Sequence, residues 1–173
     1  LDVIAAAYIS GITPVEEQDP EVYLLRGRIL FGREKFALAM KDFEEALRLA
    51  PSRRDIMVDF GKSLYEMARY DDAVPYFKQV LAGDPQNPDA NYFLGRIALR
   101  SGDTERATGY LTESVKRNPS RFAEAHRLLG LIYKDKGLRT LARDSFMAYI
   151  KHTKDRKSTE AVEVQRLLDK GTY

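Results

Sequence analysis

The apolar residues of this chain recur at helical spacing within short segments that polar residues separate. In residues 54–69, Met57, Phe60 and Leu64 lie three or four positions apart, which places them on one face of a helix. After a polar break, Phe77 and Val80 begin a second stripe of the same kind. The spacing therefore predicts two short amphipathic helices joined by a tight connection.

Pro75 lies within the second of these stripes and restricts where that helix can begin. Proline lacks the backbone N–H that a helix interior needs, so it is tolerated only in the first turn. Because Asp71 and Asp72 suit the start of a helix, we expect the helix to begin there, with Pro75 in its first turn. The run Gly83-Asp84-Pro85 is expected to end it.

The same pattern repeats four times along the chain. Helical glycines recur in steps of 34, 34 and 35 residues, at Gly27, Gly61, Gly95 and Gly130. Alanines recur with the same steps, each followed four residues later by a large apolar residue: Phe43, Phe77, Leu111 and Phe146. Small residues let paired helices approach closely, and the large ones fill the space beside them. One helix pair cannot bury its apolar face alone, so the pairs are expected to stack.

These spacings, with prolines recurring at Pro51, Pro85 and Pro119, resemble the tetratricopeptide repeat family over residues 20–156. The resemblance implies an all-α fold, a right-handed α-α solenoid of four helical hairpins at 20–53, 54–87, 88–121 and 123–156. Residues 157–173 are expected to form a C-terminal capping helix, with Ser158 as its N-cap. Residues 1–19 are expected to form a helical segment, and one interpretation is a remnant of an earlier repeat.

The composition disfavours some classes of function but does not identify one. The formal net charge of +2, from 28 basic and 26 acidic residues, is too small to favour a general polyanion binder. No apolar run is long enough to span a membrane. The absence of cysteine leaves the compartment open, and we weakly favour the cytoplasm. Because the chain begins at Leu1, a removed leader or further domain is also considered, with a periplasmic or membrane-tethered location as the alternative.

The sequence contains no pattern typical of catalysis. Its two histidines, His126 and His152, have no accompanying acids at metal-ligand spacing, and no glycine-rich phosphate loop is present. His126 is expected to be a satisfied core or boundary residue. We therefore expect no enzyme activity, no metal and no cofactor.

Candidate binding residues follow from the resemblance, which implies that the first helix of each hairpin lines a concave groove. The residues placed in that groove are basic or aromatic: Arg28, Phe31, Lys62, Tyr65, Tyr92, Arg96, Arg127 and Lys134. Such a surface suits an acidic or carboxylate-bearing peptide with apolar anchors. The alternative is that these cations are solvated, or paired with nearby acids.

The sequence thus predicts an adaptor or scaffold that binds a protein or peptide. One alternative is self-assembly into a homo-oligomer. Another is RNA binding by a related helical repeat, which the 34-residue steps and the acids Asp55, Asp59 and Asp89 disfavour. No nucleic-acid partner is expected.

Overall fold

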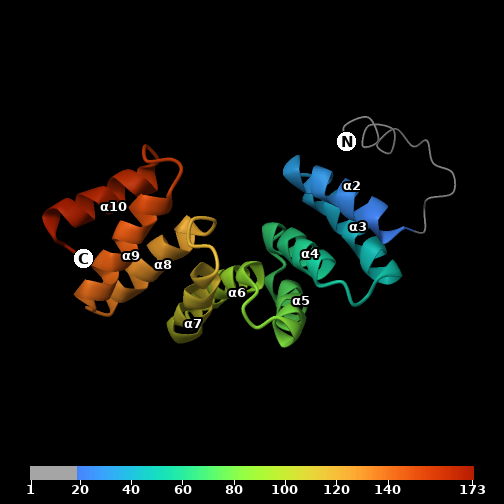
Figure 1. Cartoon of the computed structure of the whole chain (residues 1–173), viewed down its shortest axis with the longest axis horizontal. Helices are drawn as coiled ribbons and strands as arrows, with labels where there is room; N and C mark the ends of the chain where they lie inside the picture. The colour runs from blue at the N-terminus through green and yellow to red at the C-terminus, as the bar shows by residue number, and fades with distance from the viewer. Residues whose placement is uncertain (1–18) are drawn as a thin grey trace. The chain divides into compact units, whose positions relative to one another are not determined.

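A computed structural model describes residues 19–173, and all of the secondary structure in this range is helical. The expected N-terminal helical segment lies outside the described residues, apart from Asp19. Figure 1 shows consecutive helices packed as hairpins. The helices are α2 (Pro20–Gly32), α3 (Phe36–Leu49), α4 (Arg54–Glu66), α5 (Tyr70–Gly83), α6 (Pro88–Arg100), α7 (Thr104–Lys116), α8 (Ala123–Asp135), α9 (Arg139–His152) and α10 (Thr159–Lys170). No described helix is both long and apolar enough to cross a bilayer.

The chain divides into two compact units. Unit 1 ends at Gly83 and contains the hairpins α2–α3 and α4–α5. Unit 2 runs from Asp84 to Tyr173 and contains the hairpins α6–α7 and α8–α9, with α10 packed on α9. Two hairpins stack within each unit, through α3 with α4 and through α7 with α8.

The starts of two first helices follow the capping chemistry of the sequence. Asp19 accepts a hydrogen bond from the backbone N–H of Glu21 at 2.8 Å, and Asn87 accepts one from Ala90 at 3.0 Å. A proline follows each cap at the first helical position, where its missing N–H costs nothing. Local sequence therefore sets where α2 and α6 begin.

Helix α5 begins one residue before the predicted start, and the prediction that Pro75 lies in its first turn is wrong. The helix begins at Tyr70, and the N–H of Ala73 already donates to the backbone oxygen of Arg69 at 3.1 Å. Pro75 is therefore the sixth residue of α5 and lies beyond its first turn, where it cannot donate to the carbonyl of Asp71. Asp71 and Asp72 lie within the first turn, where their negative charges suit the helix dipole.

The close approach of the helices within each hairpin depends on the repeated glycines. A Cβ added at Gly61 would lie 2.8 Å from the ring of Phe77, and one at Gly95 would lie 2.8 Å from the side chain of Leu111. A Cβ added at Gly27 or Gly130 would lie closer still to a phenylalanine ring of the paired helix. The predicted packing of small against large residues is confirmed in all four hairpins.

Helix α10 covers the apolar side of α9. Ala161 and Val164 are buried in one cluster with Phe146 and Tyr149 of α9. The hydroxyl of Ser158 accepts from the backbone N–H of Ala161 at 3.3 Å, which caps the start of α10. Gly171 ends the helix in the left-handed conformation, at φ 62°.

Candidate functional site

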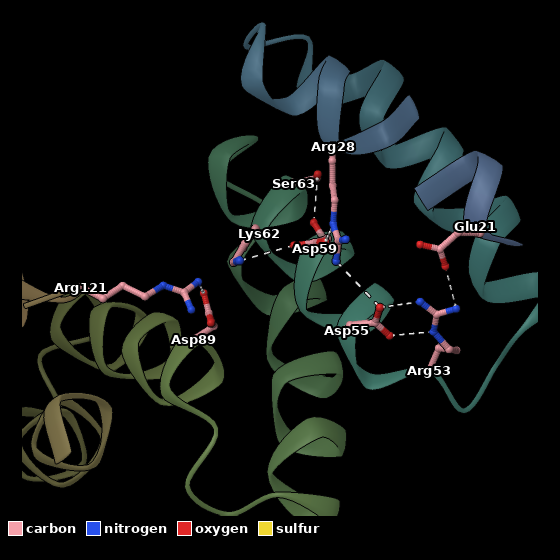
Figure 2. A network of polar contacts seen from close by, with 9 residues as sticks. All are labelled: Glu21, Arg28, Arg53, Asp55, Asp59, Lys62, Ser63, Asp89 and Arg121. Carbon is pink, nitrogen blue, oxygen red and sulfur yellow. Dashed lines mark hydrogen bonds and ion pairs between the residues drawn. The ribbon is translucent and has the colours of Figure 1, made fainter. Parts of the chain in front are cut away.

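In unit 1, the two predicted groove cations are joined through one carboxylate. The Nε of Arg28 on α2 donates to Asp59 Oδ2 at 2.6 Å, and the Nζ of Lys62 donates to Asp59 Oδ1 at 3.4 Å. Figure 2 shows Asp59 of α4 between them. The Asp59 side chain is 14% exposed, so this contact is shielded from solvent more than an ordinary surface ion pair.

Arg53 extends this network along the same side of unit 1. Its guanidinium binds both oxygens of Asp55, at 2.9 and 2.6 Å, and reaches Glu21 at 3.0 Å (Figure 2). The hydrogen bond from Arg53 holds the pKa of the Asp55 carboxyl below its usual range. Arg28 lies 3.8 Å from the same carboxylate. Three cations therefore face three carboxylates here, and the network carries no net charge.

The predicted groove aromatics of unit 1 pack within their own hairpins. Phe31 meets Phe36 edge to face, with ring centroids 5.1 Å apart, and Tyr65 meets Tyr70 in the same way at 5.1 Å. Each contact joins the end of a first helix to the start of the following second helix. Tyr65 is 7% exposed, so its main contribution is to hairpin packing.

In unit 2, an aromatic side chain supports the corresponding cation. The guanidinium carbon of Arg96 lies 5.5 Å from the centroid of the Tyr92 ring, one helical turn earlier on α6. The Tyr92 ring in turn packs against Phe93 at 5.3 Å and Phe122 at 5.0 Å. A planar cation over an aromatic face is an attractive arrangement that also orients the guanidinium.

The first turns of α6 and α8 carry two further ion pairs. Arg127 binds Glu124 through two nitrogens, at 2.6 to 3.1 Å, and this contact raises the pKa of the guanidinium. Arg121 donates to Asp89 at 2.7 Å, the unit 2 pair that is visible in Figure 2. Lys134 lies further along α8 and is half-buried, and its side chain makes no ion pair or hydrogen bond within residues 19–173.

The structure therefore brings some predicted site residues together and leaves others apart. Arg28 and Lys62 meet through Asp59, and Tyr92 and Arg96 meet directly. The sequence interpretation left open whether nearby acids pair with the predicted cations, and it did not name those acids. Their signal was present for Lys62 and Arg127, since Asp59 and Glu124 lie three residues earlier on the same helix.

The two histidines are neighbours in the fold. His126 of α8 stacks on His152 of α9, with ring centroids 5.7 Å apart and planes 22° from parallel. The expectation that His126 is satisfied is wrong, because its buried Nε2 has no hydrogen-bond partner among the described residues. Burial, and then the neighbouring His152, lower the pKa of His126. The described residues hold no cluster of three or more potential metal ligands.

Stacked hairpins, each with a glycine beneath a large apolar side chain, define a helical-repeat module for protein–protein interaction. The chain belongs to the tetratricopeptide repeat family. Family models described as tetratricopeptide repeat match residues 20–53 and 64–132.

Two curated proteins are similar over part of the chain. The peroxisomal targeting signal receptor of Saccharomyces cerevisiae is 29% identical over 93 residues, which is 54% of this chain and 15% of the receptor. The TPR repeat-containing protein YpiA of Bacillus subtilis is 22% identical over 120 residues, which is 69% of this chain and 28% of that protein. The chain thus matches less than a third of the length of either relative.

Solved structures of the same fold confirm the all-α solenoid class. The thermophilic TPR protein TTC0263 of Thermus thermophilus superposes with a TM-score of 0.70 at 20% identity, over 88% of this chain and 84% of that one. YrrB, described as a TPR protein with an unusual peptide-binding site, gives a TM-score of 0.68 at 18% identity, over 96% and 91%. MamA gives 0.68 at 21% identity, over 91% and 87%.

Proposed function

We propose that this chain is a non-catalytic adaptor that binds an acidic peptide segment with apolar anchors on the first helices of its hairpins. The charge balance of the two units carries the proposal. In unit 1, the groove cations and the arginine beside them face an equal number of carboxylates. In unit 2, Arg96, Arg121, Arg127 and Lys134 face Asp89, Glu124 and Asp135. Over the whole of unit 2, residues 84–173, there are 17 basic and 12 acidic residues, against 11 and 14 in residues 1–83, so positive charge is in excess in unit 2.

The excess positive charge favours unit 2 for the main contact with the peptide. An acidic segment gains more from a surface with net positive charge than from a balanced network, whose internal pairs it would have to replace. Tyr92 lies beside Arg96, is only partly buried, and provides apolar surface for an anchor residue. Unit 1, with Arg28, Phe31, Lys62 and Tyr65, then contributes less affinity.

The fold supports this use of the surface. YrrB is described as having a peptide-binding site, and the yeast relative is described as a receptor for a targeting signal. Both descriptions concern recognition of a peptide or a protein segment. The charges of this chain, and not the partners of those proteins, support an acidic partner.

The test compares charge reversals in the two units. Peptides are first selected from a display library on the whole chain, and their affinities are then measured by fluorescence anisotropy. We expect acidic and apolar residues to be enriched, and Kd to rise with added salt because screening weakens such contacts. Combined reversal of Arg96→Glu and Lys134→Glu should cost about 2–4 kcal/mol of binding free energy, against well under about 1 kcal/mol for Lys62→Glu.

The control reverses an exposed charge on a second helix. Lys78→Glu on α5 should leave both the helical content and the affinity unchanged. Equal losses in Lys78→Glu and in the unit 2 variant would overturn the proposal. Light scattering of the wild type at rising concentration separates peptide binding from self-assembly, which would show a growing mass without any peptide.

A further inference from the structure

A second apolar surface lies at the C-terminal end of unit 2, between α9 and α10. Two adjoining hollows of about 380 and 470 Å³ share Ile150, Arg156, Gln165 and Asp169 in their walls. Met147 of α9 and Val162 of α10 line them and are 49% and 47% exposed. Large apolar side chains left half-exposed on both sides of a groove are typical of a surface that another molecule covers.

The rim of this groove is positively charged. Arg143 and Lys151 come from α9, Arg156 from the connection that follows it, and Arg166 from α10. Among the residues that line the two hollows, one is acidic, Asp169. One of its carboxylate oxygens accepts a hydrogen bond from the Gln165 side chain at 2.9 Å.

These rim cations differ from three cations of the first helices. Arg28, Lys62 and Arg127 each bind a carboxylate at 3.4 Å or less. Within residues 19–173, none of the four rim cations makes an ion pair or a side-chain hydrogen bond. Four basic side chains around an apolar floor, with one acid, make a surface complementary to negative charge.

We propose that the α9–α10 groove is a second docking site, which takes an acidic amphipathic peptide segment of a partner protein. Apolar residues of the segment would cover Met147, Ile150 and Val162, and its carboxylates would meet Lys151 and Arg156. The two helices form a concave floor, and a helical or extended segment fills such a floor better than a flat lipid surface does. The proposal is independent of the first-helix surface, because it uses none of the same residues.

The test uses a fluorescein-labelled peptide with leucines at helical spacing and glutamates between them, titrated with the whole chain. Anisotropy should report saturable binding that weakens with added salt. Combined reversal of Lys151→Glu and Arg156→Glu should weaken binding roughly threefold to tenfold, since two partly exposed contacts are lost. The matched charge control is Lys41→Glu with Lys78→Glu, at exposed sites of unit 1 that should leave Kd unchanged.

The apolar floor has its own matched control. Met147→Gln and Val162→Gln should weaken binding of the probe peptide. Leu25→Gln and Leu38→Gln, at sites 44% and 49% exposed in unit 1, should leave its affinity unchanged. All four sites are exposed enough for the variants to fold, which circular dichroism checks. Arg96→Glu in the first-helix surface separates the two sites: binding lost only in Lys151→Glu with Arg156→Glu assigns the probe to the groove, whereas binding lost only in Arg96→Glu assigns it to the first-helix surface and overturns the proposal.

Three outcomes would overturn the proposal. The first is no binding of the probe, and the second is an equal response of groove and control variants. The third is groove-dependent binding to phosphatidylserine vesicles that the peptide does not compete for, because the surface would then serve a membrane.

Discussion

The same position of the repeat is used differently in the two units. Lys62 of α4 and Arg96 of α6 lie 34 residues apart, each directly after its repeat glycine. Lys62 has Asp59 three residues earlier and is paired with it. Arg96 has Phe93 at that position and stacks on Tyr92. The side chains three and four positions earlier therefore differ between the two repeats. Lys62 contacts a carboxylate of a neutral network, and Arg96 contacts an aromatic ring.

This difference shows what a row of like charges means in a repeat protein. Seen one residue per repeat, Arg28, Lys62 and Arg96 form a uniform basic series. When their contacts are included, two of these side chains share one partly buried carboxylate, and the third lies over an aromatic ring. Affinity for an acidic partner depends on the charge that remains after such pairing.

The largest expected effect is a loss of stability in unit 2 that leaves unit 1 nearly unchanged. Deletion of residues 158–173 would expose Phe146 and Tyr149, whose cluster α10 completes. We expect aggregation or a loss above about 3 kcal/mol in unit 2, because loss of a terminal cap exposes the core of a repeat stack. Hydrogen exchange of α4 amides should change little. An equally stable, monomeric truncation would contradict this view of α10.

Overpacking at one repeat glycine should act on one unit at a time. Gly61→Leu in unit 1 should cost about 1–3 kcal/mol, since an added Cβ already meets the Phe77 ring, and Gly130→Leu should do the same in unit 2. Chemical denaturation followed by hydrogen exchange locates the loss. The control is Gly109→Ala in α7, where no atom lies within 4 Å of the added Cβ. That change should stabilise by about 0.5–1 kcal/mol.

A double-mutant cycle measures the neutral network of unit 1. Asp59→Asn should destabilise by on the order of 1 kcal/mol, because it weakens a charged acceptor that two cations share. Its coupling to Arg28→Gln, across a 2.6 Å contact, should exceed its coupling to Lys62→Gln, across 3.4 Å. Asp59→Asn should also raise the affinity of unit 1 for acidic peptides. A coupling energy of zero in both cycles would show that the charged groups of the network are solvated and do not stabilise one another.

The smallest expected effect is a pH dependence confined to unit 2. Because the folded-state pKa of His126 is lowered below 6.5, the unfolded chain binds protons more readily in that range. Stability should therefore be complete above pH 6.5 and decrease as the pH falls towards the folded-state pKa. His126→Tyr should flatten the melting temperature of unit 2 over this window. Unit 1 has Met57 at the equivalent position and provides the internal reference.

Much of the fold could be predicted from local patterns. The 34-residue period identifies the hairpins, Asp19 and Asn87 mark helix starts, and each repeat glycine meets its predicted apolar partner. The start of α5 could not be predicted in this way. Pro75 removes one backbone hydrogen bond from the helix without preventing an earlier start, and α5 begins at Tyr70.

The candidate site was less predictable for a physical reason. The pairs Asp59–Lys62 and Glu124–Arg127 lie within one helix, so their spacing alone could have identified them. Arg28–Asp59 joins residues 31 apart and depends on how two hairpins stack. The contact of His126 with His152 likewise joins two helices, and no local pattern indicates that the rings stack.

The ion pairs Arg53–Glu21 and Arg121–Asp89 repeat with a period of two hairpins. Each joins residues 32 apart, and the second pair repeats the first after 68 residues, twice the length of one hairpin repeat. Both arginines end the same Pro-Ser-Arg tripeptide, whereas Asn87, midway between them, caps a helix instead. A shared period of two repeats is the signature expected if an ancestral gene segment encoding a pair of hairpins was duplicated in tandem. The heritable module of this chain would then be the hairpin pair, and each of its two compact units contains one such pair.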